Sequence, residues 1–243
     1  MIVCQKVGYS YDRERRALED ITFSIARGES VGLIGANGAG KSTLMKALLG
    51  LLPAEGRILV DGIPVEKATL PRIRRKLGFV LQNSDNQMFM PTVYEDMLFA
   101  PLNYGLSRQE AEARVDDALD RLGLQALKHR HNHRISGGEK RMAAIATILA
   151  MGPEALLMDE PTAALDPFNR RLVIDIIRGL PQTRLITSHD LDMILDTCDR
   201  VILLAGGRIA ADGPAEALLR DRALLEANRL ELPLRLQGPG RGN

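Results

Sequence analysis

Residues 35–43 read Gly-Ala-Asn-Gly-Ala-Gly-Lys-Ser-Thr, and this stretch determines the predicted fold. The phosphate-binding pattern G-x-x-x-x-G-K-[ST] has its fixed positions filled by Gly35, Gly40, Lys41 and Ser42. Glycines lack a Cβ, so the backbone can turn its N–H groups inward, and the start of the following helix adds partial positive charge. The stretch therefore predicts a loop that binds the phosphates of a nucleoside triphosphate.

The side chains of this phosphate loop (residues 35–43) have distinct expected roles. Lys41 should reach the β- and γ-phosphates, and the Ser42 hydroxyl should bind Mg²⁺. The remaining contacts with the nucleotide are expected from Gly35, Asn37, Gly38, Ala39, Gly40 and Thr43. A bare glycine-rich turn is the alternative, but such a turn has no need of the Lys-Ser pair that follows the last glycine.

The composition is that of a soluble enzyme. A chain of 243 residues with 45% hydrophobic content can form one large α/β domain with a smaller subdomain. The net charge of +1 favours no nucleic-acid partner. Two cysteines are too few for a disulfide framework, no apolar run spans a bilayer, and the N-terminus lacks the form of a secretory signal. We therefore expect a cytosolic location.

The order of the expected elements predicts a parallel sheet covered by helices. Strands are expected at 2–7, 21–25, 30–34, 57–60, 155–158, 185–187 and 201–204. A helix-rich segment lies at about 92–127, where Ser107 and Glu110 form a capping box before the apolar stripe Ala111, Val115, Ala118, Leu119 and Leu122. We expect one nucleotide-binding domain over 1–232, with a helical subdomain at about 90–150 and a flexible tail at 233–243.

Two carboxylates follow the apolar strand expected at 155–158. Asp159 stands at the carboxyl end of that strand, where an aspartate that holds Mg²⁺ is expected in a phosphate-binding α/β fold. Glu160 could then act as the general base toward the attacking water. The same dipeptide alone would more often be a helix start or a surface turn, and the presence of the phosphate loop favours the catalytic pair.

A second glycine-rich turn opens the helix expected at 140–150. Ser136 and Glu139 match a capping box, which is the structural alternative. That alternative does not explain Gly137 and Gly138, because each glycine in a helix costs about 1 kcal/mol relative to alanine. Bare backbone at a helix N-terminus instead favours a second phosphate-facing site.

These residues together resemble the nucleotide-binding subunit of an ABC transporter, over nearly the whole chain. Residues 35–43 resemble the Walker A loop, 156–160 the Walker B strand and 136–139 the signature motif. Gln82 resembles the Q-loop glutamine, Ala164-Leu165-Asp166 the D-loop, and His189 the switch histidine. The resemblance implies a P-loop NTPase core of α/β class with a parallel sheet, an antiparallel β subdomain and a helical signature subdomain.

The resemblance also assigns roles to individual residues of an ATPase that uses ATP and Mg²⁺. Glu160, His189 and Gln82 would be catalytic, and Mg²⁺ would be held by Ser42, Gln82 and Asp159. Asp166 and the signature residues Ser136, Gly137, Gly138 and Glu139 would contact nucleotide, although the family has Gln more often than Glu at position 139. Tyr11 matches the aromatic residue that stacks on adenine, and Tyr9 is an open alternative.

The partners implied by the resemblance follow from the fact that each motif occurs once. Two copies would build two complete sites, with ATP between the phosphate loop of one subunit and the signature motif of the other. A homodimer is therefore expected, bound to a transmembrane coupling protein and a substrate-binding membrane component at the cytoplasmic face of the membrane. No nucleic-acid partner is expected.

A finer resemblance covers 81–106 and 224–233. Both stretches are similar to the energy-coupling-factor group, and more narrowly to the ATPase subunit of cobalt and nickel uptake systems, although Ser84 replaces a usual Pro. Import of a vitamin such as biotin, a soluble non-transport ABC ATPase and a scaffold that binds ATP without turnover are the alternatives. His129, His131 and His133 alternate in a segment with loop character, so we expect a solvated loop there and no metal site.

The segment 82–101 is the expected contact with the membrane partner. Its polar start is followed at once by Met88, Phe89 and Met90, which could fill the core or form a docking surface. The position of this segment in the family favours docking.

Overall fold

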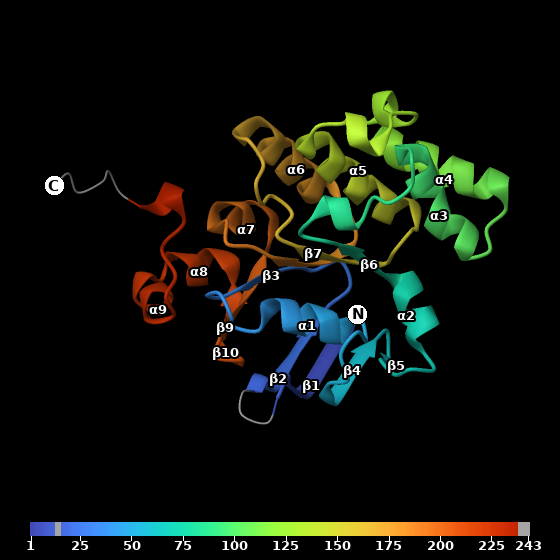
Figure 1. Cartoon of the computed structure of the whole chain (residues 1–243). Coiled ribbons are helices and arrows are strands. Elements are labelled where there is room, and N and C mark those ends of the chain that lie inside the picture. Colours follow the sequence, from blue (N-terminus) through green and yellow to red (C-terminus); the bar gives the residue numbers. More distant parts are fainter. Residues whose placement is uncertain (13–15, 238–243) are drawn as a thin grey trace. The chain divides into compact units, whose positions relative to one another are not determined.

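The computed structural model describes residues 1–12 and 16–237, in two compact units. Unit 1 combines residues 1–73 with 181–243, and unit 2 is residues 74–180. Helix α2 (Leu70–Lys76) contains the boundary between them. Each unit is described by itself below (Figure 1).

Unit 1 contains the antiparallel sheet that the sequence predicts. Its strand order is β2-β1-β4-β5, with β1 at Ile2–Ser10, β2 at Arg16–Ile25, β4 at Glu55–Val60 and β5 at Ile63–Pro64. Ile2, Cys4 and Val7 of β1 are buried, and the alternation is interrupted at Gln5 and Lys6, where the pairing register with β2 shifts. Asp61 and Gly62 both have positive φ between β4 and β5, which suits the tight turn of a hairpin.

A second group of strands in unit 1 is mainly parallel. β3 (Ser30–Ile34) pairs in parallel with β8 (Thr183–Thr187) and β9 (Arg200–Ala205), and β10 (Arg208–Pro214) is antiparallel to β9. Every residue of β3 and β8 is buried, as is usual for inner parallel strands. The two-residue loop between β9 and β10 is Gly206-Gly207 with φ of 54° and 80°, which suits a hairpin turn. The helices of this unit are α1 (Lys41–Leu48), α7 (Leu191–Thr197), α8 (Ala215–Arg220) and α9 (Arg222–Ala227).

Unit 2 contains a pair of parallel strands and most of the long helices. β6 (Leu77–Val80) and β7 (Ala155–Asp159) pair in parallel. The helices are α3 (Val93–Asn103), α4 (Arg108–Leu122), α5 (Gly137–Ala150) and α6 (Pro167–Gly179), and single 3-10 turns occupy Ser84–Asn86, Gln125–Leu127 and Asn132–Arg134. Helices α3, α4 and α5 pack against one another (Figure 1).

Local signals in the sequence explain where these helices begin. The predicted capping box of α4 is present, because Ser107 and Glu110 exchange side-chain and backbone hydrogen bonds. The predicted apolar stripe of α4 is buried at Ala111, Val115, Ala118 and Leu119, and Leu122 is partly buried. Equivalent capping boxes start α3 at Thr92 and α5 at Ser136.

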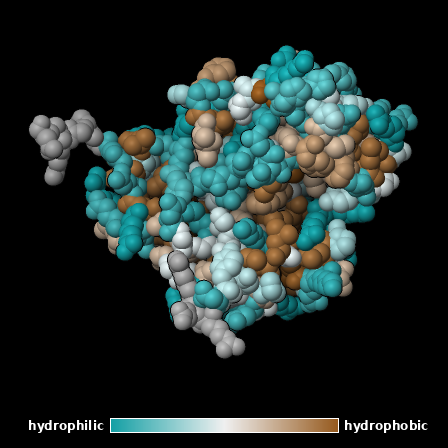
Figure 2. Space-filling model, in the orientation of Figure 1, coloured by the Kyte–Doolittle hydropathy of each residue, from teal (hydrophilic) through white to brown (hydrophobic). Residues whose placement is uncertain are grey.

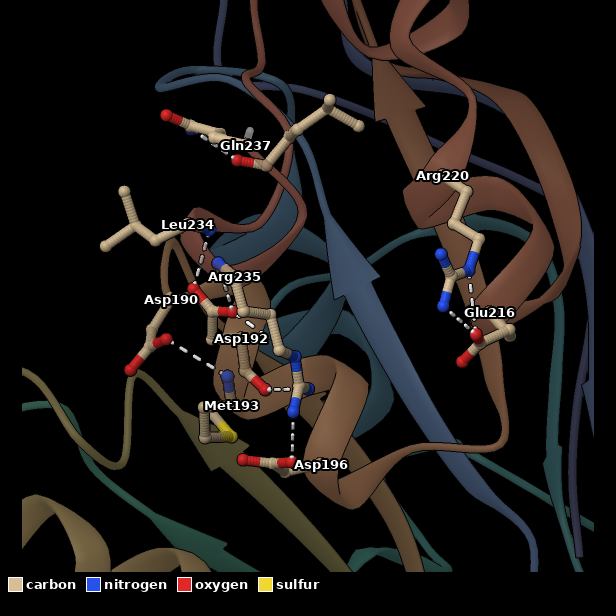
Figure 3. Close-up of polar contacts among 10 residues, drawn as sticks. Asp190, Asp192, Met193, Asp196, Glu216, Arg220, Leu234, Arg235 and Gln237 are labelled. Atoms are coloured by element: carbon tan, nitrogen blue, oxygen red, sulfur yellow. Dashed lines mark hydrogen bonds and ion pairs between the residues drawn. The ribbon is translucent and has the colours of Figure 1, made fainter. Parts of the chain in front are cut away.

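The first part of the predicted flexible tail is held in place. Residues 234–236 form a 3-10 turn whose Leu234 and Arg235 backbone N–H groups donate to the Asp192 carboxylate of α7. The Arg235 guanidinium also donates to Asp196, at 2.8 Å (Figure 3). Arg235 thus reaches two carboxylates one helical turn apart. The expectation of a flexible tail stays a prediction, and residues 238–243 lie outside the described part.

Both cysteines are buried in unit 1 and form no disulfide. Burial raises the pKa of the Cys4 thiol to about 12 and that of Cys198 to about 11, since a thiolate would lose its hydration there. Among residues 1–12 and 16–237, no helix is both long and apolar enough to cross a membrane.

Candidate functional site

The phosphate loop connects β3 to α1 in unit 1. Gly40 is the N-cap of α1 with φ of 110°, and a Cβ there would lie 2.6 Å from the Ala17 carbonyl oxygen, so only glycine fits. The Lys41 side chain is buried, and its Nζ donates to the carbonyl oxygens of Gly35 at 2.6 Å and Ala36 at 3.3 Å. The lysine charge therefore lies inside the curve of the loop, while Ser42 is exposed beside it.

The two tyrosines lie beside this loop. Tyr11 is 60% exposed, and its hydroxyl is 3.3 Å from the Thr43 hydroxyl. Tyr9 and Tyr11 contact edge to face, with ring centroids 4.9 Å apart. Tyr11 is thus the more exposed of the two rings, and its hydroxyl contacts a residue of the phosphate loop.

His189 lies two residues after the end of the buried strand β8. Thr187 and Ser188 are fully covered, whereas His189 is exposed. The Ser188 hydroxyl accepts from the Asp190 N–H, and the Asp190 carboxylate caps α7 through Met193 N–H. These hydrogen bonds fix the backbone turn that carries the His189 imidazole.

In unit 2 the predicted carboxylate pair stands at the end of β7. Asp159 is the last residue of β7 and is partly buried, and Glu160 follows it at 8% exposure. Glu160 has φ of 49°, a left-handed conformation that costs about 1–3 kcal/mol for a residue other than glycine. A strained, nearly buried carboxylate at a strand end is typical of a functional site rather than of a surface turn.

The signature turn (residues 136–139) contains the predicted capping box. The Glu139 carboxylate accepts from Ser136 N–H at 2.7 Å, and these hydrogen bonds lower the pKa of Glu139. The two glycines differ in their surroundings. A Cβ on Gly137 would meet nothing within 4 Å, whereas one on Gly138 would lie 2.3 Å from the Asn169 side chain. Only Gly137 therefore leaves backbone open to another molecule, and Gly138 makes room for α6.

Three of the predicted motifs line one cavity of about 550 Å³ in unit 2. It is lined by Gln82, Asn83, Ser84 and Asp85, by Ile135, Gly137, Lys140 and Arg141, and by Ala163, Ala164 and Leu165. The glutamine, the signature turn and the D-loop are thus brought together. Asp166, the last D-loop residue, caps α6 through Phe168 and Asn169 N–H groups, and its hydrogen bonds with Asn169 lower its pKa.

The alternating histidines form two ring contacts in a loop. His131 and His133 have ring centroids 5.3 Å apart, and His129 lies 5.5 Å from the Tyr94 ring. Over residues 1–12 and 16–237, no group of three or more His, Cys, Asp or Glu side chains could hold a metal ion. The histidine rings thus lie beside each other and beside an aromatic ring.

The buried polar residues that the sequence reasoning missed include Asp96, Asn132 and Arg141. All three hold the segment 81–90 or its neighbours through hydrogen bonds. The signal available for Arg141 was a charged residue at the start of an otherwise apolar run, Met142 to Ala150. Asp96 and Asn132 gave no signal, because their burial depends on contacts between distant parts of the chain.

Comparison with known proteins places this architecture in a family. A family model described as ABC transporter matches residues 18–163. An ABC transporter ATP-binding protein of Geobacter sulfurreducens is 49% identical, covering 95% of this chain and 93% of the relative. The energy-coupling factor transporter ATP-binding protein EcfA of Methanothermobacter thermautotrophicus is 43% identical over 96% of this chain and 77% of its own length.

Two further comparisons are with CbiO proteins. The cobalt import ATP-binding protein CbiO of Rhodobacter capsulatus is 42% identical, covering 96% of this chain and 86% of the relative. The solved structure of CbiO1 from Clostridium perfringens, part of the ABC transporter complex CbiONQ, has a TM-score of 0.84 at 34% identity and covers 93% of both chains. The predicted fold and the predicted resemblance to the energy-coupling-factor group are confirmed by these relatives.

The two glycines of the signature turn predict different outcomes on substitution by alanine. Gly137→Ala should keep or raise the melting temperature, since alanine favours the helix by about 1 kcal/mol and its Cβ meets open space. Gly138→Ala should lower it, because Asn169 must rotate away and lose its hydrogen bond to Asp166. Thermal unfolding of both variants measures this. Equal melting temperatures would show that Asn169 does not set the requirement for glycine at 138.

Proposed function

This chain belongs to the ABC transporter family, and we propose that it is the ATP-hydrolysing subunit of an energy-coupling-factor importer for cobalt or nickel ions. Family members couple ATP hydrolysis to transport, so the chain is an ATPase of a transporter. Within this proposal, cobalt is supported by likeness to a relative that is named for cobalt import.

The phosphate loop is the observation that carries the nucleotide part of the proposal. Its buried Lys41 ammonium lies among loop carbonyls, and the N-terminus of α1 begins at the same residue. A positive charge and helix N–H groups at one place match the β- and γ-phosphates of ATP. The exposed Tyr11 ring beside Thr43 would supply a face for adenine, with Tyr9 supporting it edge-on.

The chemistry of the donors fits Mg²⁺ as well. A hydroxyl, an amide oxygen and a carboxylate, from Ser42, Gln82 and Asp159, are the oxygen ligands that this ion prefers. Bound Mg²⁺ would neutralise charge on the phosphates. Glu160 would take the proton of the attacking water, and His189 would donate a hydrogen bond to the γ-phosphate.

A homodimer completes this arrangement. The chain carries each motif once, and Gly137 leaves open backbone at the signature turn. In the proposed dimer this backbone approaches the ATP held by the phosphate loop of the second copy, which is where a helix N-terminus favours phosphate. Asp166 would lie near the same contact.

The carboxylate Glu160 gives a test of both hydrolysis and dimer formation. Glu160→Gln should hydrolyse ATP roughly 10² to 10⁴ times more slowly, the usual contribution of a general base. Uncleaved ATP should then hold two copies together, because a ligand that bridges subunits stabilises the dimer by mass action. Steady-state hydrolysis and gel filtration with Mg²⁺-ATP measure the two effects.

Lys41→Ala is the control for this experiment, since it should stay monomeric through loss of ATP binding. Normal hydrolysis by the Glu160→Gln variant would remove Glu160 from the catalytic role. A variant that hydrolyses slowly yet remains monomeric at saturating ATP would contradict the shared site.

An apolar surface in unit 2 is the proposed contact with the transmembrane coupling protein. It consists of Phe89, Phe99 and Leu102, which are exposed by 63%, 43% and 37%, and we call it the docking surface. The two phenylalanine rings contact edge to face at 4.9 Å. Figure 2 shows hydrophobic surface where Figure 1 draws α3, the helix that carries two of these residues. Met88, by contrast, is buried and belongs to the core.

A charge on the docking surface should weaken association with the membrane partner. Phe89→Asp would place a carboxylate in a desolvated contact, which costs several kcal/mol and should reduce copurification at least about tenfold. ATP affinity of the soluble variant should be unchanged. Leu234→Asp, an exposed apolar residue of unit 1, is the matched control. Intact copurification of Phe89→Asp would exclude docking through this surface, and loss of ATP binding would assign Phe89 to the core.

Ion uptake by cells tests the cargo. Cells that express this chain with its membrane partners should accumulate radioactive cobalt or nickel, and cells with the Lys41→Ala variant should not. Uptake of biotin or another vitamin in place of the ions would favour the vitamin alternative. No ATP-dependent uptake of either kind, with ATPase activity intact, would favour a soluble non-transport ATPase.

A further inference from the structure

One face of helix α5 holds the segment 81–90. The residues that make these contacts are Lys140, Arg141, Ala144 and Thr147, which lie on neighbouring turns of the helix. Lys140 pairs with the Asp85 carboxylate, and the carbonyl oxygen of Ala144 accepts from the Gln87 side chain at 2.6 Å. The Thr147 hydroxyl lies 3.6 Å from the Met88 sulfur. The segment between β6 and α3 is therefore attached along two turns of the signature helix.

Arg141 makes the central contact of this set. Its Nη1 donates to the Leu81 carbonyl oxygen at 2.6 Å, and its Nη2 donates to the Gln82 carbonyl oxygen. The side chain is 5% exposed, and burial lowers the pKa of the guanidinium. In the described part of the chain Arg141 forms no ion pair, so two peptide carbonyls are what stabilises its charge.

Burying the Arg141 charge in this way contributes little to the free energy of unfolding, so stability alone does not explain the contact. A buried charge without a counter-ion loses hydration that two neutral acceptors replace only in part, and apolar residues of similar volume often serve the core as well or better. The Nε atom of Arg141 is also buried and has no hydrogen-bond partner among the residues that the structure describes. What the guanidinium provides instead is a fixed geometry, since its planar fork sets the two carbonyls at Leu81 and Gln82 relative to α5.

The far end of the segment is held by a second buried group. The Asp96 carboxylate of α3 accepts from the N–H groups of Phe89 and Met90, both at 3.1 Å, and from the Asn132 side chain. Asn132 also donates to the Met90 carbonyl oxygen at 2.7 Å. Burial raises the pKa of Asp96 despite these hydrogen bonds. Asn132 precedes the signature turn and Arg141 follows it, so both ends of the segment are bonded to residues that flank that turn.

We infer that Arg141 is a positioning residue that joins Gln82 to the signature turn, so that the docking surface, Gln82 and the signature turn move as one body. This inference rests on the proposed function, in which Gln82 serves the ATP site. A displacement of Phe89 by the membrane partner would then reach the residues that flank the signature turn through the buried groups Asp96, Asn132 and Arg141. Arg141 touches no reacting atom in this assignment and acts only by holding the backbone at Gln82.

The first test replaces Arg141 by methionine, which keeps the volume and removes the charge and donors. The melting temperature of Arg141→Met should equal or exceed that of the wild type. In the full chain, kcat of ATP hydrolysis should fall about tenfold while KM stays within about twofold, because a displaced group near the chemistry loses rate rather than binding. Hydrogen exchange should become at least about tenfold faster in 81–87 and remain unchanged in the second half of α5.

Two variants separate positioning from packing. Arg121→Met makes the same change at an arginine of α4 that pairs with Asp117 at the surface and does not line the cavity, so it should leave kcat and exchange in 81–82 unchanged. Arg141→Lys keeps a donor and the charge, so it should restore part of the lost rate. If Met and Lys at 141 behave alike, the residue only fills space and the inference is wrong.

A double-mutant cycle with Gln82→Ala tests whether Arg141 acts through Gln82. The rate loss of Arg141→Met should largely disappear in the Gln82→Ala background, since the positioned side chain is already absent. Additive losses, or wild-type kcat and exchange in Arg141→Met, would overturn the inference. These readouts use the soluble chain alone, so a failure of the uptake experiment would affect the proposed cargo and leave this test unchanged.

Discussion

Unit 1 depends on the close approach of strands β2 and β9 to the phosphate loop. A Cβ at Gly35 would lie 2.3 Å from the Leu204 carbonyl oxygen of β9, and one at Gly40 would lie 2.6 Å from that of Ala17 in β2. Backbone of β2 and β9 thus lies closer to the loop than any other residue type allows. Hydrogen bonds from Gly207 N–H to the Ala39 oxygen and from Glu19 N–H to the Gly207 oxygen link the loop, the hairpin and β2. The loop keeps its curvature because its surroundings are backbone, which changes little in shape.

In unit 2, an irregular segment is held by buried side chains rather than by neighbouring backbone. Its segment 81–90 contains one short 3-10 turn and otherwise lacks regular structure, so the hydrogen bonds that a helix or strand would supply must come from elsewhere. They come from buried side chains, chiefly Arg141 and the Asp96–Asn132 pair. Side chains can exchange partners more easily than a β ladder can. A segment held in this way can be well ordered in one state and still be displaced by a partner that competes for the same groups.

Much of the fold and the candidate site could be predicted from local patterns. The phosphate loop, the strand that ends at Asp159, the capping boxes at Ser107 and Ser136 and the hairpin at Gly206-Gly207 each depend on residues close together in the sequence. The separate reasons for Gly137 and Gly138 could not be predicted, because Asn169 is brought there by tertiary packing. The same holds for Arg235 on Asp192 and for Asp96 on Asn132, where a polar side chain gives no sign of its distant partner. The roles of Glu160 and His189 remain predictions from their sequence motifs.

The burial of both cysteines has a practical consequence for measuring conformational changes of this chain. At neutral pH each thiol stays protonated and covered, so reagents that modify accessible thiolates have no ready target in the natural sequence. A single cysteine introduced at an exposed position would be the one reactive thiol, and a fluorescent or spin label attached there would report from a known place. The chain can therefore be labelled at one position without first replacing Cys4 and Cys198.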